Sequence, residues 1–147
     1  KVFIVDGKLS DRKRTPFASG GLYSTAADVT AFYQMMLNGG VSQGKRLLKK
    51  KTVKQMTQTQ TGNIETGFVD GMSWGLGFQV VKKSKGATGM LSSGTYGHGG
   101  AYATQSWADP KTGLIYVLMI QRAGFPNGDN SLVRKGFQQA AVDEFVR

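Results

Sequence analysis

Hydrophobic residues recur at helical spacing in residues 24–40, near the beginning of the chain. Apolar side chains that lie three and four positions apart line one face of a helix. Thr25 and Asp28 have the spacing of a capping box at its start, although Ser24 is an alternative N-cap. The pattern therefore predicts an amphipathic helix whose inward face carries Val29, Phe32, Tyr33, Met36 and Leu37.

Two further segments have helical patterns. A short helix is predicted after the loop that follows residue 40, with its lysines outside and with Leu48, Val53 and Met56 facing inward. Residues 131–147 predict a closing helix. Its apolar stripe is expected to contain Leu132, Val133, Phe137, Ala140, Ala141 and Phe145.

Strand-like segments occupy residues 1–5, 74–83, 101–109 and 114–121. The last of these, LIYVLMIQ, is apolar at successive positions, which predicts a central strand in a sheet that helices cover on both sides. Residues 63–73 are predicted to form a loop, in which Phe68 is a candidate contact for a ligand. No repeat or linker divides the chain, so we expect one domain over residues 1–147.

Composition narrows the chemistry that this domain can perform. The chain has 147 residues and is 39% hydrophobic, which is enough for a core of its own. It has no cysteine and one histidine, so we expect neither a metal site nor thiolate chemistry, and no cofactor. The longest apolar stretch, GLIYVLMI, is far shorter than the roughly 20 residues of a membrane-spanning helix.

The chain carries a net charge of +10, with a dense run of lysines and arginines in residues 45–54. Such a run is either a solvated surface or a binding site for an anionic polymer. Aromatic residues do not alternate with the basic ones as a base-stacking surface requires, so we do not expect a nucleic-acid partner. A small basic module that binds an anionic polymer is therefore one hypothesis for function.

The histidine, His98, lies in the segment GTYGHGGAYATQSWADPKTGL. Glycines on both sides leave the backbone accessible to another molecule, and Tyr96 and Tyr102 bracket the segment with hydroxyl groups. An imidazole there can donate a proton, accept one or titrate near neutral pH. The alternative is a turn histidine whose ring is bonded to a backbone carbonyl.

Two motifs of serine hydrolases occur by letter, both in turn-like surroundings. S-x-x-K is found at Ser10–Lys13 and at Ser42–Lys45, but a catalytic copy requires the serine at the start of a buried helix. K-T-G occurs at residues 111–113, directly after Asp109 and Pro110. This order of residues is typical of a β-turn, so we interpret the K-T-G as a hairpin turn.

Several segments in order resemble the C-terminal part of the serine β-lactamase and penicillin-binding protein superfamily. They are GGLYSTAADVTAFYQMMLNGG, LLKKKTVKQMTQTQTG, WGLGFQV, GTYGHGGAYATQSWADPKTGLIYVLMIQ and the closing helix. The likeness favours the class C-like branch, which includes esterases, DD-peptidases and D-aminopeptidases. It implies an α+β fold, in which an antiparallel sheet is flanked by helices.

The same resemblance implies an assignment of site residues. His98-Gly99-Gly100 corresponds to the family's third active-site motif, which is K-T-G or a variant such as H-x-G. His98 would then help to hold the substrate, and the N–H of Ala101 would be one of two oxyanion-hole donors. We expect Gly99, Gly100, Tyr96 and Tyr102 to contribute to substrate binding.

The family's other motifs have no credible copy in this chain. Its S-x-x-K lies far upstream, and its Tyr-x-Asn motif is matched at none of the five tyrosines here. The resemblance implies that the chain is the C-terminal portion of a larger, exported hydrolase, that it lacks the nucleophile, and that it is inactive alone. The substrate would be a small acyl compound or a peptidoglycan-like peptide, bound together with the missing N-terminal part.

The missing part also has a consequence for assembly. In the family, N-terminal strands pair beside the last strand of the sheet. Without them, the apolar strand at residues 114–121 would have an unpaired edge. We therefore expect a homo-oligomer that buries this edge.

Overall fold

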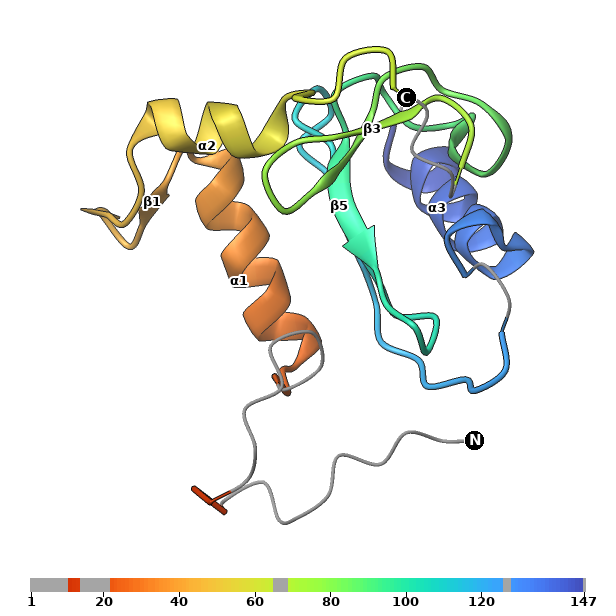
Figure 1. The fold of residues 1–147 in the computed structure, drawn as a ribbon, viewed down its shortest axis with the longest axis horizontal. Helices are drawn as coiled ribbons and strands as arrows, with labels where there is room; N and C mark the ends of the chain where they lie inside the picture. The colour runs from red at the N-terminus through yellow and green to blue at the C-terminus, as the bar shows by residue number, and fades with distance from the viewer. Residues whose placement is uncertain (1–10, 14–21, 65–68, 126–127, 147) are drawn as a thin grey trace.

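The computed structural model describes residues 11–13, 22–64, 69–125 and 128–146 (Figure 1). The predicted strand at residues 1–5 and the candidate ligand contact Phe68 lie outside these ranges. The described residues form an α+β fold with three α-helices: α1 (Ala26–Leu37), α2 (Lys50–Thr57) and α3 (Leu132–Phe145). Two 3-10 helices are present as well, η1 (Gly86–Thr88) and η2 (Gly128–Asn130).

A five-stranded antiparallel sheet forms the centre of the molecule. Its spatial order follows the chain, from β3 (Met72–Trp74) through β4 (Gln79–Val81), β5 (Tyr96–Gly99) and β6 (Gln105–Ala108) to β7 (Ile115–Leu118). A separate two-stranded hairpin pairs β1 (Val41–Ser42) with β2 (Lys45–Arg46). No helix among the described residues is long and apolar enough to cross a membrane.

Helices cover both faces of the large sheet, and each face has its own hydrophobic cluster. On the face toward α1, Tyr33 and Met36 pack with Tyr96 and Ala108. On the opposite face, Trp107 and other sheet residues pack against α3. Figure 1 shows β5 between α1 and α3. This alternation arises because successive side chains of a strand point to opposite faces.

The first helix begins at the predicted N-cap, Thr25, although the reciprocal bond of a capping box, from the Thr25 backbone N–H to the Asp28 side chain, is not among the bonds of the described residues. The Thr25 hydroxyl accepts a hydrogen bond from the Asp28 backbone N–H at 3.1 Å and donates one to the Asp28 carboxylate at 2.8 Å. Thr25, rather than Ser24, is therefore the N-cap. The buried side differs from the prediction in part, since Phe32 is 43% exposed and Met35 is buried. The helix packs against β1 as well as against the sheet, and this widens its buried face.

The predicted second helix is confirmed as α2. Val53 is buried, and Leu48 and Met56 pack against the same cluster. Residues 74–83, by contrast, are not one strand as predicted. A turn closed by the Gly75 N–H and the Phe78 carbonyl, 2.8 Å apart, separates β3 from β4. Gly77 permits this turn with a φ of +85°.

The most apolar strand, β7, lies at an edge of the sheet that the described residues form, as the family resemblance implied, and not at its centre as the apolar pattern predicted. Both of its faces are nevertheless covered, because α1 and α3 contact it from opposite sides. Apolar residues at successive positions of a strand therefore indicate that both faces of the sheet are covered. They do not indicate whether the strand has a neighbour on each side. Assembly through this edge stays a prediction.

The closing helix buries a different stripe from the expected one. Phe137 and Ala141 pack against the core as predicted, whereas Leu132 is 85% and Phe145 70% exposed. Val133 and Ala140 are also exposed. The most deeply buried residues of α3 are instead Arg134 and Gln138. Polar groups of this kind tolerate burial when they are hydrogen-bonded, and Arg134 donates to the Asp129 carbonyl at 2.8 Å.

Three buried tyrosines make the stability of this fold sensitive to high pH. Burial raises the pKa of Tyr33 and Tyr116 to about 12, and it raises that of Tyr96 as well. The unfolded chain releases these protons near pH 10. The stability that these protonated tyrosines contribute is therefore fully present below about pH 10 and is lost as the pH rises through about 12. We expect the free energy of unfolding to fall in this window, as measured by urea denaturation.

Replacement of Tyr33 by phenylalanine provides the control for this prediction. Tyr33→Phe removes one titrating group, so the slope of stability against pH between about 10 and about 12 should decrease. All other groups are the same in the two proteins, so their contributions cancel in the comparison. An equal slope in the two proteins would contradict the expectation.

Candidate active site

His98 lies on the face of β5 that points toward α1. It is directly opposite Ser106 of β6, and cross-strand partners of this kind share one face of the sheet. The Tyr33 hydroxyl donates a hydrogen bond to the Ser106 carbonyl at 2.8 Å and lies 3.2 Å from the Ser106 hydroxyl oxygen. The ring of Trp74 lies 5.2 Å from the His98 ring, centroid to centroid. The sequence identified His98 as a candidate site residue but did not identify Ser106. A hairpin centred on Tyr102 would have placed Ser106 opposite His98.

The orientation of the imidazole leaves one of its nitrogens accessible. Nδ1 of His98 faces the carbonyl oxygen of Gly99, so Nδ1 carries a hydrogen in this arrangement. Within the described part of the chain, Nε2 has no hydrogen-bond partner, and the side chain is exposed. Nε2 can therefore accept a hydrogen bond from a neutral ring or donate one from a protonated ring. Both interpretations of His98 therefore apply. One ring nitrogen binds a backbone carbonyl, as in a turn histidine, and the other stays accessible to a ligand.

The glycines around His98 face protein atoms. A Cβ on Gly97 would lie 2.2 Å from the Ser106 carbonyl oxygen, and one on Gly99 would lie 1.8 Å from a carboxylate oxygen of Asp129. A Cβ on Gly100 would lie 2.2 Å from the Thr104 hydroxyl oxygen. These glycines therefore allow close packing of the chain against itself. Substrate contact by Gly99 and Gly100 stays a prediction.

The turn between β5 and β6 places Ala101 at its exposed tip. The Gly100 carbonyl accepts from the Ala103 N–H at 2.9 Å, and the Gly100 N–H donates to the Thr104 carbonyl at 2.8 Å. Ala103 completes this three-residue loop with a φ of +70°, a conformation that usually selects glycine. Over the described ranges, the N–H of Ala101 makes no backbone hydrogen bond. Ala101 is exposed at the tip, so its N–H is available to an external acceptor.

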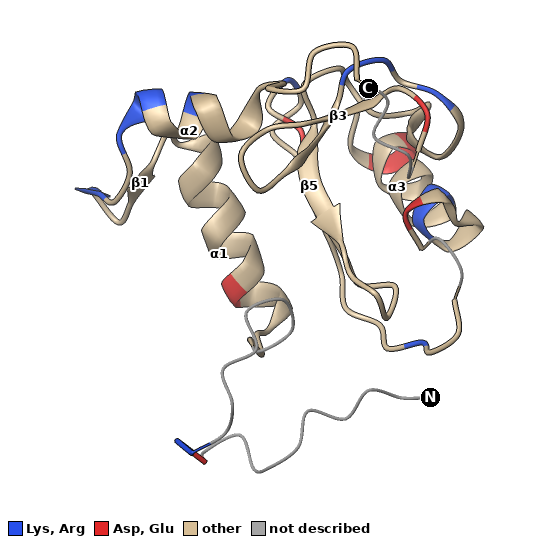
Figure 2. Ribbon diagram, in the orientation of Figure 1, with Lys and Arg blue, Asp and Glu red and all other residues tan. Residues whose placement is uncertain are grey.

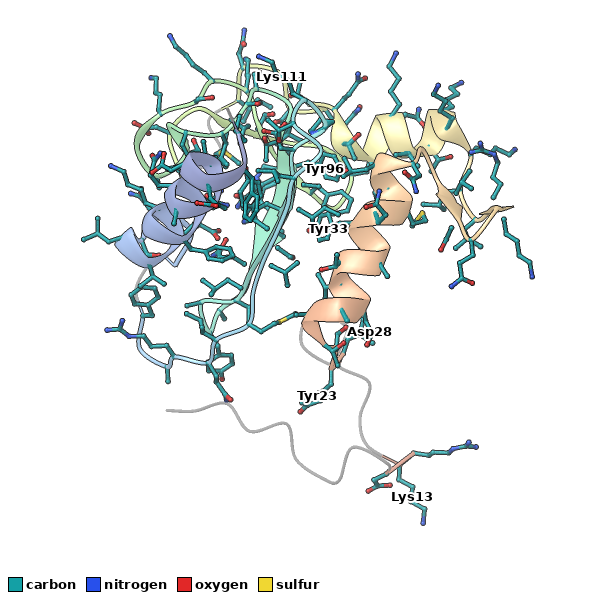
Figure 3. All side chains as sticks on the ribbon, turned by 180° about the vertical axis from the view of Figure 1, so that it is seen from behind. Lys13, Tyr23, Asp28, Tyr33, Tyr96 and Lys111 are labelled. Carbon is teal, nitrogen blue, oxygen red and sulfur yellow. The ribbon has the colours of Figure 1, made fainter. Side chains whose placement is uncertain are left out.

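The two bracketing tyrosines are in different environments. Tyr96 is a core residue, with its ring 6.1 Å from that of Tyr33 and 5.4 Å from that of Phe78. Figure 3 shows Tyr33 and Tyr96 close together between α1 and the sheet. Burial of Tyr96 argues against direct contact between its side chain and a substrate. Tyr102 is half-buried in the turn, and its proposed contact with substrate stays a prediction.

The K-T-G letters form a turn, as predicted. The Asp109 carboxylate accepts from the N–H of Lys111 at 2.8 Å and from that of Thr112 at 3.3 Å. The Asp109 carbonyl accepts from Gly113, whose φ is +76°. The S-x-x-K letters at Ser42–Lys45 lie in the turn of the β1–β2 hairpin and start no helix. The other copy begins at Ser10, outside the described residues.

Lysine and arginine residues are frequent on the β1–β2 hairpin and α2, where no acidic residue is seen (Figure 2). Residues 29–64 contain no aspartate or glutamate. Arg46 is held in place by hydrogen bonds to the carbonyls of Gly39 at 2.9 Å and Leu48 at 3.0 Å. Binding of an anionic polymer stays a prediction for this surface. Its exposed basic residues are Lys45, Arg46, Lys49, Lys50, Lys51 and Lys54.

Two curated bacterial proteins are similar in sequence to this chain. The chain is similar to Protein Rv1367c of Mycobacterium tuberculosis, with 35% identity over 71% of this chain and 28% of the relative. It is also similar to an Escherichia coli protein that is provisionally named a D-alanyl-D-alanine carboxypeptidase, with 30% identity over 74% of this chain and 24% of that protein. The chain therefore spans less than a third of the length of these curated relatives.

Solved structures support the fold independently. A beta-lactamase from Mycobacterium bovis superposes with a TM-score of 0.62 at 22% identity, covering 84% of this chain and 45% of that one. A structure from Bacteroides dorei superposes with a TM-score of 0.55 at 20% identity, covering 92% of this chain and 45% of that one. The Beta-lactamase family profile matches residues 4–141. With this match over nearly its whole length, the chain belongs to the beta-lactamase family.

Proposed function

We propose that this chain is the substrate-side wall of a serine hydrolase that transfers acyl groups through a serine ester. The observation that carries the proposal is the end of β5. There the exposed His98 ring is followed three residues later by the N–H of Ala101, which makes no backbone hydrogen bond within the described residues. A ring nitrogen and a backbone donor near the end of one strand are suited to bind the carbonyl group of an acyl substrate. The family membership supports the same interpretation.

Each of the two groups has a separate role in this proposal. The Ala101 N–H donates a hydrogen bond to the oxyanion that forms when the nucleophile attacks the carbonyl carbon. One fixed donor of this kind typically lowers the barrier by about 3–4 kcal/mol. His98 holds the substrate through Nε2, while its Nδ1 stays on the Gly99 carbonyl. It also contributes to the proton network around the leaving group.

The remaining groups come from sequence upstream of Lys1. We propose that this part supplies the nucleophilic serine and lysine of an S-x-x-K, the tyrosine of a Tyr-x-Asn, and the second oxyanion donor. Residues 1–147 alone are then inactive. An imidazole in place of the lysine of K-T-G favours esters or D-amino-acid peptides over β-lactams as substrates. Export of the whole protein follows from a peptidoglycan-like substrate.

Reading the coding sequence upstream of Lys1 tests this proposal first. We expect an S-x-x-K followed by a Tyr-x-Asn. The protein made from that sequence should be labelled on its S-x-x-K serine by an activated ester or a β-lactam, and a serine-to-alanine change there should abolish labelling. The matched control is residues 1–147 alone, which should remain unlabelled. Labelling of this shorter chain, lost on mutation of one of its own serines, would disprove the assignment.

A further inference from the structure

A network of buried polar side chains lies on the face of β5 opposite His98. At its centre is Asp129, a half-buried residue of η2. Its carboxylate accepts a hydrogen bond from the Gln105 side-chain amide at 3.0 Å and lies 3.3 Å from the side-chain nitrogen of Gln79, which donates a second. Gln79 belongs to β4 and Gln105 to β6, the two neighbours of β5 in the sheet. One carboxylate therefore links the two strands that flank β5.

The orientation of the Gln105 amide is fixed by its other partner. The indole N–H of Trp107 donates to the Gln105 side-chain oxygen at 2.7 Å. Because an indole can only donate, the Gln105 amide must present its oxygen to Trp107 and its nitrogen to Asp129. The Gln105 side-chain nitrogen therefore needs a hydrogen-bond acceptor, and the Asp129 carboxylate supplies it.

The backbone of Asp129 is held by the same group of residues. The Arg134 guanidinium donates to the Asp129 carbonyl at 2.8 Å and lies over the Trp107 ring, 3.9 Å from its centroid. The contacts form a closed circuit from the Asp129 carboxylate through Gln105, Trp107 and Arg134 back to the Asp129 carbonyl. Trp107 and Arg134 are fully buried, so the circuit is anchored in the core.

Gly99 is the point at which this circuit meets the proposed active site. A Cβ at residue 99 would lie 1.8 Å from Oδ1 of Asp129 and 2.6 Å from the Gln105 side-chain nitrogen. The Asp129 carboxylate can lie over β5 and reach both neighbouring strands only because Gly99 has no side chain. Gly99 also supplies the carbonyl that orients the His98 ring, and it precedes the Gly100–Thr104 loop that presents Ala101.

We propose that Asp129 is a positioning residue that fixes the end of β5, and with it the Ala101 N–H and the His98 ring, for acyl transfer. This inference rests on the proposed function. Asp129 contacts neither substrate nor reacting atoms, and it acts by linking the strands on both sides of Gly99. Small errors in the placement of such groups are costly, since a displacement of about 1 Å can lower a rate about 100-fold.

The test uses Asp129→Ala in the protein that includes the upstream sequence. We expect the single-turnover acylation rate constant for an activated ester to fall about 10- to 100-fold at saturating substrate, because the oxyanion donor and the His98 ring are both displaced. Asp129→Asn keeps one acceptor and should recover part of the loss. The matched control is Asp143→Ala, which removes an exposed carboxylate from α3 and should leave the rate unchanged. A wild-type rate in Asp129→Ala would overturn the proposal, as would an equal loss in all three variants.

A second measurement needs no substrate and separates this inference from the proposed function. The N–H groups of Gly100 and Ala103 are both hydrogen-bonded in the loop after β5. In Asp129→Ala their hydrogen exchange should accelerate about tenfold, the factor expected from the loss of one or two hydrogen bonds nearby. Unchanged exchange would overturn the positioning role even if the enzyme is active. If the wild type is never acylated, the proposed function fails while this measurement still decides the role of Asp129.

Discussion

Replacement of Ala101 by proline should lower the acylation rate constant of the whole protein about 100- to 1,000-fold, with little effect on its stability. Proline removes the N–H that we assign to the oxyanion hole. That N–H makes no backbone hydrogen bond within the described residues, so its loss leaves the fold intact. Ala101 is the second residue of the turn from Gly100 to Ala103, a position where proline is favoured. The preceding Gly100 has no Cβ to clash with the proline ring.

Ala101→Gly is the matched control for this substitution. It keeps the N–H and should retain most of the acylation rate, although a glycine at the tip makes the loop more flexible. The measurement is single-turnover acylation by an activated ester, together with urea denaturation of both variants. If Ala101→Pro acylates as fast as Ala101→Gly, the oxyanion donor lies elsewhere. If both variants lose stability equally, the loss of rate reports damage to the loop.

Much of the fold follows from local patterns along the chain. The Thr25 N-cap and the Asp109 turn each depend on side chains that bond to backbone groups close in sequence, so their positions could be read directly. Residues 74–83 were harder, because Gly75 and Gly77 interrupt an otherwise strand-like pattern and only the hydrogen bond across the turn divides it. The position of β7 at a sheet edge is not encoded in its own residues.

The buried stripe of α3 illustrates a second limit of sequence reasoning. Apolar periodicity predicted that Leu132 and Phe145 would face the core, where the structure places Arg134 and Gln138. Arg134 can be buried because Trp107, 27 positions earlier, supplies an aromatic face and Asp129 supplies a carbonyl. These partners cannot be predicted from the residues of α3 itself. The same holds for the candidate site: glycines and a histidine marked β5, but the carboxylate that fills the space beside Gly99 comes from Asp129.

Truncation of Trp107 should have the largest effect on stability. Its side chain is 0% exposed, donates to Gln105 and lies beneath the Arg134 guanidinium. Trp107→Ala should therefore lower the free energy of unfolding by about 3–5 kcal/mol, measured by urea denaturation of the protein that carries this chain. Trp107→Phe keeps a ring under Arg134 but loses the N–H and part of the ring volume, so it should cost less, about 1–3 kcal/mol.

An exposed apolar residue of α3 provides the contrast to Trp107. Leu132 was predicted to be in the core but is 85% exposed, so Leu132→Ala should change stability by about 0.5 kcal/mol or less. A loss at Trp107→Ala no larger than that at Leu132→Ala would show that the face of the sheet toward α3 is not packed as described. The Asp129 circuit would then lose its anchor, because Trp107 is the residue that joins Gln105 to Arg134. The stability of this core and the geometry of the proposed oxyanion donor are thus tied to the same indole.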